Sequence, residues 1–112
     1  MEMFNALEAF ASLSQETRLR VFKLLVEYGS DGLLPGKIAS QLKIPDNTLS
    51  FHLSHMAKAG LVTSKKQGRQ ITYFANCDLM DDLVDFLVQN CCSKQAKPKG
   101  GKAKNGCNER KC

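Results

Sequence analysis

Residues 38–74 read IASQLKIPDNTLSFHLSHMAKAGLVTSKKQGRQITYF, and this stretch decides the fold. Its first residues, 38–42, are the end of a helix predicted over 35–42. Pro35 begins this helix, because proline suits the first turn of a helix. The three residues 43–45 leave room only for a tight turn. A second helix over 47–59 follows, with Asp46 as its N-terminal cap. The stretch therefore predicts two helices joined by a tight turn.

A β-hairpin is predicted directly after this helix pair. Residues 61–64 and 71–74 are rich in β-branched and aromatic side chains, which favour strands. Between them, residues 65–70 are polar, basic and contain a glycine, as a hairpin connection does. We expect a wing with a basic tip, and hence a winged helix-turn-helix.

Three further helices complete a mainly α fold. Apolar residues at helical spacing predict a short helix at the start of the chain. A second helix is expected over 15–28, capped by Ser14, and a last one over 79–91, capped by Asp78. The residues expected to face the core from the helix over 15–28 are Leu19, Phe22 and Val26.

The helix over 47–59 carries the candidate DNA contacts. Leu49, Leu53 and Met56 recur at helical spacing and should face the core. Short polar side chains then lie outward near the helix start, where they can reach base edges in a major groove. Residues 37–69 hold six basic residues and one acidic residue, a local footprint for DNA. The predicted contacts are Asn47, Thr48, Ser50 and Phe51 on the helix, and Lys66 and Arg69 on the wing.

Charge also divides the chain into two parts. Residues 93–112 hold seven basic residues and one acidic residue, with no apolar periodicity. We expect 1–92 to be one DNA-binding and dimerisation domain and 93–112 to be a flexible tail rich in Lys and Cys. No apolar run approaches the roughly 20 residues of a membrane span. The chain start lacks the basic region of a secretory signal, so we expect a cytoplasmic protein without a membrane partner.

The predicted last helix indicates a homodimer. Most of its circumference is apolar, and its polar residues form one narrow stripe. A helix in one small domain needs a single apolar face, so the surplus should meet a second copy of the chain, together with the first helix. A two-fold dimer would also place two reading helices on a two-fold operator in double-stranded DNA.

Cysteines cluster beyond that helix. Cys91 and Cys92 are adjacent, and both thiolates can hold one soft ion. Arsenite and antimonite are trivalent and thiophilic, so a third sulfur from Cys107, or from Cys112, would complete the site. Zinc held by four thiolates and a thiol redox switch are the alternatives. Cys77, between strand and helix, is expected to be a small buried hydrophobe.

Several segments together resemble a known family. They are SQETRLRVFKLL (14–25), TLSFHL (48–53), AGLV (59–62) and GRQITYF (68–74). With residues 4–91 as a whole, they resemble the ArsR/SmtB family of winged-helix, metal-sensing bacterial repressors. The resemblance implies a homodimer with five helices and a two-stranded wing, which releases operator DNA when its ligand binds.

Residue by residue, the resemblance narrows the ligand. By position, the residues that match the family's base-reading stretch are Asn47, Thr48, Ser50 and Phe51, and His52 matches its H-L motif. His52 also has a structural interpretation, as a side chain packed beside Leu53 or bonded to the backbone, so it stays out of the predicted contacts. Residues 40–42 lack the C-V-C pair of the common arsenic sensor, and the last helix lacks the His of the zinc branch. Residues 90–92 instead resemble the branch with N-C-C at the end of the last helix.

Enzyme activity is not expected. The sequence has no glycine-rich phosphate loop and no nucleophile with a matching base. None of the five cysteines is followed by the phosphate-cradling loop and Arg that a thiol-based arsenate reductase needs.

Overall fold

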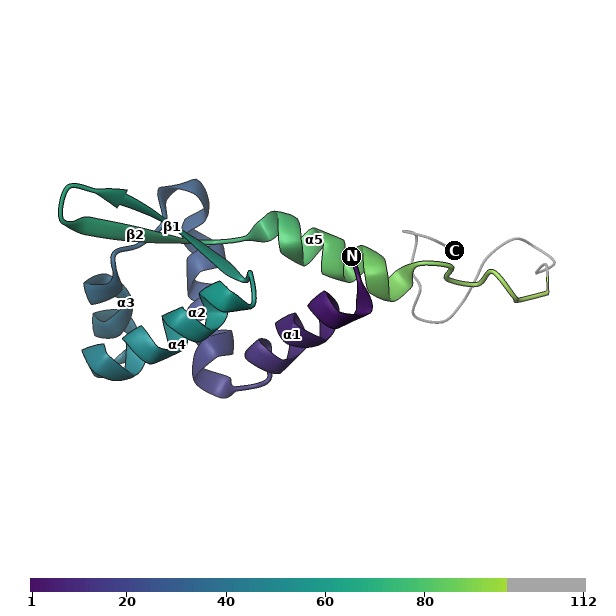
Figure 1. Ribbon diagram of the computed structural model, residues 1–112, viewed down its shortest axis with the longest axis horizontal. Coiled ribbons are helices and arrows are strands. Elements are labelled where there is room, and N and C mark those ends of the chain that lie inside the picture. The colour runs from purple at the N-terminus through teal and green to yellow at the C-terminus, as the bar shows by residue number, and fades with distance from the viewer. Residues whose placement is uncertain (97–112) are drawn as a thin grey trace.

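The computed structural model describes residues 1–96. Within that range the chain forms five α-helices, one short 3₁₀ helix and a two-stranded hairpin (Figure 1). In chain order they are α1 (Met3–Leu13), α2 (Glu16–Tyr28), η1 (Gly29–Asp31), α3 (Pro35–Leu42), α4 (Asp46–Lys58), β1 (Val62–Gln67), β2 (Gln70–Ala75) and α5 (Cys77–Val88). The mainly α winged helix-turn-helix prediction is confirmed. Residues 97–112, most of the predicted tail and with it Cys107 and Cys112, lie outside the described residues.

The core lies where α1 to α4 meet one another and the start of the hairpin. Leu49, Leu53 and Met56, predicted to face it from α4, are all buried. From α1 the core receives only small residues, Ala6, Ala9 and Ser12. Small side chains let α1 lie close to α2 and α4, and they leave its larger apolar side chains on the outer side of the helix.

On α2 the predicted core face is partly wrong. Phe22 is buried as expected, but Leu19 and Val26 are 43% and 45% exposed. The helix instead buries Val21 and Leu25 beside Phe22. Two apolar stripes overlap in the sequence of α2, and periodicity alone does not determine which of them the other helices cover.

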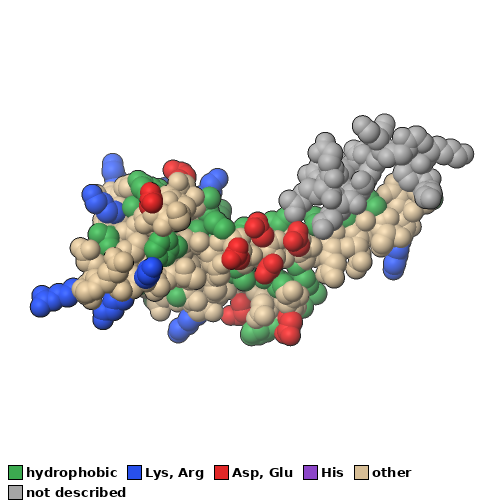
Figure 2. Space-filling model, turned by 90° about the horizontal axis from the view of Figure 1, so that it is seen from above, with side chains coloured by type: hydrophobic (Ala, Val, Ile, Leu, Met, Phe, Trp, Pro, Cys, Tyr) green, Lys and Arg blue, Asp and Glu red, His purple; other side chains and the backbone are tan. Residues whose placement is uncertain are grey.

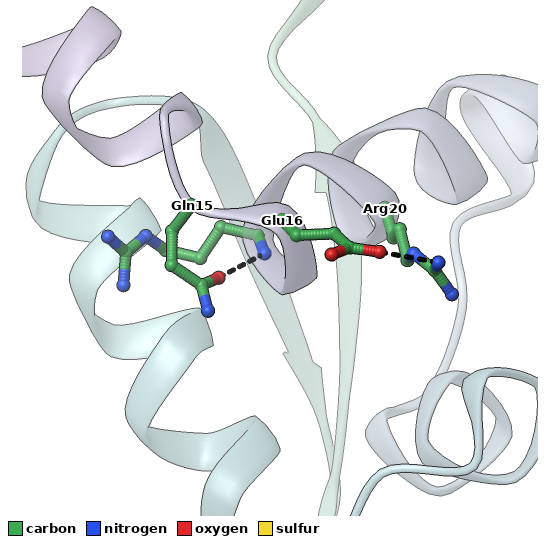
Figure 3. Close-up of polar contacts among 4 residues, drawn as sticks. Gln15, Glu16 and Arg20 are labelled. Carbon is green, nitrogen blue, oxygen red and sulfur yellow. Dashed lines mark hydrogen bonds and ion pairs between the residues drawn. The ribbon is translucent and has the colours of Figure 1, made fainter.

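The start of α2 is capped differently from the prediction. Ser14 closes α1, where its hydroxyl donates to the Ala11 carbonyl at 2.9 Å. The cap of α2 is Gln15, whose side-chain oxygen accepts from the Arg18 N–H at 2.9 Å (Figure 3). Gln15 bonds the amide three residues after it, one position further along than a Ser14 cap would reach, so the helix begins one residue later.

The caps of the other two helices also differ. Asn76, not Asp78, caps α5, because its side-chain oxygen accepts from the Leu79 N–H at 3.2 Å. The Asn76 amide also donates to the Gly60 carbonyl at 2.9 Å, which ties the start of α5 to the end of α4. Asp46 lies inside the first turn of α4 and makes no cap hydrogen bond.

The wing has longer strands and a shorter turn than predicted. Gln67 pairs with Gln70, so only Gly68 and Arg69 form the turn. Lys65 and Lys66, predicted at the tip, lie within β1. The ladder extends through these polar residues because Lys65 and Lys66 pair with Thr72 and Ile71 of β2.

A short bridge fixes the wing to the helical body. Leu33 and Tyr73 exchange two backbone hydrogen bonds, of 2.9 and 2.8 Å. Gly32, directly before the bridge, has a positive φ of 65° and is packed against the wing. A Cβ there would lie 2.6 Å from the Phe74 ring, so the close approach of the wing requires glycine.

The last helix leads away from the winged end (Figure 1). Leu83 is its buried residue, while Leu87 is 61% exposed. The helix ends at Val88, three residues before the predicted end, because Gln89 takes an extended conformation. No helix in residues 1–96 is long and apolar enough to cross a membrane.

Candidate nucleic-acid interface

The turn between α3 and α4 sets the direction of the reading helix. Lys43 ends α3 with a left-handed backbone (φ 57°), and the Ile44 N–H donates to the Ala39 carbonyl at 3.0 Å. Pro45 then leads into α4, and its carbonyl accepts from the Leu49 N–H at 2.9 Å. Only three residues separate the helices, so the N-terminal turn of α4 projects beside α3.

The outward face of α4 carries all four predicted helix contacts. Asn47, Thr48, Ser50 and Phe51 are exposed. The Asn47 side-chain oxygen accepts from the Thr48 N–H at 2.9 Å, and the amide nitrogen of this exposed side chain can act as a donor. This face therefore combines hydrogen-bonding groups with one aromatic ring, and the core side of the helix anchors it.

The wing and its surroundings are basic. Lys66 lies in β1 and Arg69 in the turn, and both are exposed. Figure 2 shows Lys and Arg side chains over the winged end of the molecule, and Asp and Glu side chains gathered over α1 and α5. The end with the reading face is thus the one whose charge suits a polyanion.

A polar cluster supports α4 from behind. Arg18 Nη1 on α2 lies 3.3 Å from Nδ1 of His52, which is only 8% exposed. Arg18 Nε also donates to the Ser12 carbonyl at 2.7 Å. The buried Ser12 hydroxyl in turn lies 3.0 Å from Nδ1 of His55. His52 is buried, as its structural interpretation predicts, but its ring bonds to the Arg18 side chain and not to the backbone. The cluster joins α1, α2 and α4.

The cluster favours a neutral His52. Burial lowers the pKa of His52 below its ordinary value of 6.5, and the charges of Arg18 and His55 lower it further. Since a guanidinium can only donate, Nδ1 of His52 must accept, which the neutral ring can do. Sequence reasoning missed the roles of Ser12 and Arg18. Both fall in helices 34 or more residues before their histidine partners, and no local pattern pairs them.

The predicted sulfur site begins beyond α5. Cys91 and Cys92 lie in turns after the helix, with their sulfur atoms 3.4 Å apart. Cys92 has a positive φ of 64°. The separation of the sulfurs is longer than the about 2.05 Å of a disulfide bond, so the two sulfurs are in contact but are not bonded to each other. Cys77, predicted to be buried, is a free and exposed thiol in the first turn of α5, because the hairpin ends before it can cover that turn.

A complete ligand set is not present in the described part of the chain. Residues 1–96 contain no group of three or more Cys, His, Asp or Glu placed to hold a metal ion. The predicted third sulfur, Cys107, lies outside these residues. The structure therefore brings Cys91 and Cys92 together and leaves the third ligand as a prediction.

Comparison with known proteins identifies the family. A family model described as a helix-turn-helix domain matches residues 13–65, which span α2 to the start of the wing. An uncharacterized HTH-type transcriptional regulator of Methanocaldococcus jannaschii is 37% identical over 90 residues, which are 80% of this chain and 94% of that protein. The chain belongs to the HTH-type transcriptional regulators.

Solved structures share the fold of this regulator. An ArsR-like transcriptional regulator from Rhodococcus sp. RHA1 is 26% identical, with a TM-score of 0.68 over 80% of this chain and 81% of the other. The transcriptional repressor BigR from Xylella fastidiosa is 28% identical, with a TM-score of 0.58 over 76% and 84%. The regulator thus has an ArsR-like winged helix-turn-helix fold, and its family is one of DNA-binding transcriptional regulators rather than enzymes.

Proposed function

We propose that the regulator is a cytoplasmic repressor that binds operator DNA as a homodimer and releases it when trivalent arsenic or antimony binds Cys91, Cys92 and Cys107. The observation that carries the DNA-binding part is the exposed, mixed polar and aromatic face of α4 beside a basic wing. The likeness to the repressor BigR supports repression.

The reading face supplies the contacts that specific binding needs. Asn47 can pair with an adenine edge in the major groove, and Thr48 and Ser50 can bond to several bases or to phosphate. Lys66 and Arg69 on the wing would neutralise phosphates on the same duplex. The helix α4 and the wing are separate elements (Figure 1). The helix can therefore enter the groove while the wing lies beside it, as in other winged helices.

The exposed apolar residues of α1 and α5 support the homodimer. Met3, Phe4 and Leu7 on α1 are 62%, 69% and 57% exposed, and Leu87 on α5 is 61% exposed. Several large apolar side chains on neighbouring helices are unusual for a monomer surface. A second copy related by a two-fold axis would cover them and set the spacing of the two reading helices.

Adjacent sulfurs at the end of α5 support the metalloid site. One soft trivalent ion can bond both Cys91 and Cys92, whose sulfurs are 3.4 Å apart. Binding requires the reduced form of both cysteines, because thiolates are the ligands. Drawing the segment after Val88 onto the ion would change the end of α5, and with it the proposed dimer contact. Derepression needs a coupling free energy of about 1–3 kcal/mol between the two sites.

Thiol oxidation is the second candidate signal. The observation that favours it is the contact between the Cys91 and Cys92 sulfurs, which lie 3.4 Å apart. In that case a change between dithiol and disulfide, with no ion bound, would alter the end of α5.

Two experiments test the proposal. Binding of the regulator to duplexes from its own promoter, against shuffled duplexes, tests the DNA function, and deletion of its gene tests repression. Equal binding to promoter and shuffled duplexes would contradict the DNA function. Lower expression of the target gene after deletion would contradict repression.

Thiol titration with native mass spectrometry separates the signals. An arsenic adduct with three thiols lost per chain supports the metalloid site. Loss of two thiols, with a mass decrease of two hydrogen atoms and no arsenic, supports oxidation. A bound zinc ion supports neither of the two signals.

A further inference from the structure

We infer that Phe51 reads the C5-methyl group of a thymine in each operator half-site. This inference rests on the proposed DNA-binding function and specifies one of its base contacts. It begins from the surface of the molecule. Within residues 1–96, the large apolar side chains that are more than half exposed are Met3, Phe4, Leu7, Phe51 and Leu87.

Phe51 differs from the other four by its position. They lie on α1 and α5, on the surface proposed for the homodimer, whereas Phe51 is 66% exposed on α4. The residues three and four positions away on the helix are all polar and exposed: Asn47, Thr48, Ser54 and His55. No neighbouring apolar surface on α4 explains the ring, so its partner must come from what this face binds.

The ring is held in place before DNA arrives. Phe51 and His52 form an edge-to-face pair, with centroids 5.7 Å apart and an interplanar angle of 67°. His52 is itself buried and fixed by Arg18, 3.3 Å away. A ring supported by a fixed partner loses less conformational entropy on binding than a free one. Arg18 and His52 are thus positioning residues for Phe51.

The chemistry of base edges identifies the partner. Phe51 has no hydrogen-bond donor or acceptor to offer, and the thymine methyl group is the apolar feature of the major groove. Phe51 lies one helical turn after Asn47, about 6 Å along the axis, which corresponds to about two base-pair steps. The thymine should therefore lie within about two base pairs of the base that Asn47 contacts.

Uracil substitution tests this contact, because deoxyuridine removes only the methyl group. Each thymine of a promoter duplex is replaced in turn, and binding is measured by fluorescence anisotropy for the wild type, Phe51→Ala and Phe51→Leu. In the wild type, replacing the contacted thymine in one half-site should weaken binding about fourfold. Replacing it in both half-sites should weaken binding about fifteenfold. Phe51→Ala should lose this dependence, and Phe51→Leu should keep much of it because leucine is still apolar.

Two results would overturn the inference. One is a scan with the wild type alone in which no thymine replacement weakens binding by more than about 1.5-fold. The other is an equal uracil cost in the wild type and Phe51→Ala. Both leave the proposed function intact if the wild type still prefers its promoter to a shuffled duplex. If that preference is missing, the proposed function fails and the inference fails with it. Unchanged melting temperatures would show that both variants fold, as expected for an exposed side chain.

Discussion

Arg18 and His52 show how a buried contact can shape an exposed reading face. The guanidinium lies 3.3 Å from the histidine ring, and burial and positive neighbours lower the pKa of His52. The folded protein therefore prefers the neutral ring. Protonation would place a second positive charge beside Arg18 from α2, and near His55 of the same helix.

This preference predicts a pH-dependent stability. The pKa of His52 is lower in the folded than in the unfolded chain, so the unfolded chain binds the proton more readily. Its contribution to stability is full above about pH 6.5 and is lost as the pH falls through the folded pKa. The slope from this one group is at most about 1.4 kcal/mol per pH unit. Urea unfolding between pH 7.5 and 5.5 measures it.

Two variants isolate the histidine responsible. His52→Gln should flatten the decline below pH 6.5. His55→Gln, on the same helix, should retain most of it because His52 is still buried against Arg18. An unchanged decline in His52→Gln would assign the effect to other groups.

Gly32 and Gly36 form a matched pair for backbone packing. A Cβ on Gly32 would approach the Phe74 ring to 2.6 Å and the Tyr73 carbonyl to 2.7 Å, and its φ is positive. Gly32→Ala should destabilise the protein by more than about 1 kcal/mol and weaken the Leu33–Tyr73 bridge. A Cβ on Gly36 in α3 meets nothing within 4 Å, so Gly36→Ala should be neutral or stabilise by up to about 1 kcal/mol. Thermal unfolding of both variants checks the contrast, and equal effects would contradict it.

At the scale of elements, the sequence predicts the helices better than their ends. Proline at the start of α3 and the apolar spacing on α4 indicate both helices correctly. The caps are wrong where a residue one or two positions away makes the bond instead, as Gln15 and Asn76 do. Several neighbouring polar side chains can each cap the start of a helix, and local sequence does not decide between them.

The wing and α2 show a second limit. Lys65 and Lys66 look like a turn because they are polar, but their pairing with β2 keeps them in the strand. Leu19 and Val26 have core-like spacing, and only the packing of the other helices leaves them exposed. Pairing register and the choice between two apolar stripes are tertiary effects, which a single sequence does not contain.

The wing predicts a salt-dependent contribution to DNA binding. Arg69→Ala should weaken binding to specific and shuffled duplexes alike, because a phosphate contact carries no sequence information. The slope of log affinity against log salt should fall by about 0.9 for each lost contact, and so by about 2 for a dimer with two wings. Lys94→Ala, beyond the end of α5, is the control and should leave the slope unchanged. A slope that Arg69→Ala does not alter would remove the wing from the interface.

At the scale of the whole molecule, basic and acidic side chains gather at different ends. Basic side chains with a few acidic ones lie over the winged end, and a larger cluster of acidic side chains lies over α1 and α5, which also carry exposed apolar residues (Figure 2). Such a molecule can bind DNA at one end and a second copy at the other without competition between the two surfaces. The apolar composition of α5 predicts this surface from sequence, whereas the exposure of Phe4 and Leu7 comes from the small residues that α1 turns to the core.

The homodimer can be tested by one charge on α1. Leu7→Glu, at a position 57% exposed, should give a monomeric mass by light scattering and at least about tenfold weaker operator binding, because the two reading helices are no longer linked. Val26→Glu, 45% exposed on α2, is the control and should remain dimeric with normal binding. A dimeric Leu7→Glu protein would move the interface elsewhere.

The sulfur site could be predicted only in part. The sequence places Cys91 beside Cys92, and the structure puts their sulfurs 3.4 Å apart. In the structure α5 ends at Val88, so Cys91 and Cys92 lie in turns and not on the helix. Cys77 was predicted from its apolar neighbours to be buried, but exposure at the start of a helix depends on where the hairpin ends.

The central claim is that a soft ion on the cysteines releases the regulator from DNA, and one titration tests it most directly. Arsenite is added to the reduced regulator bound to a fluorescent promoter duplex, and anisotropy is followed for the wild type, Cys91→Ser, Cys92→Ser and Cys77→Ser. We expect the wild type and Cys77→Ser to leave the duplex, and both variants of the adjacent pair to stay bound. A wild type that remains bound at saturating arsenite, or release that persists in both Cys91→Ser and Cys92→Ser, would contradict the account.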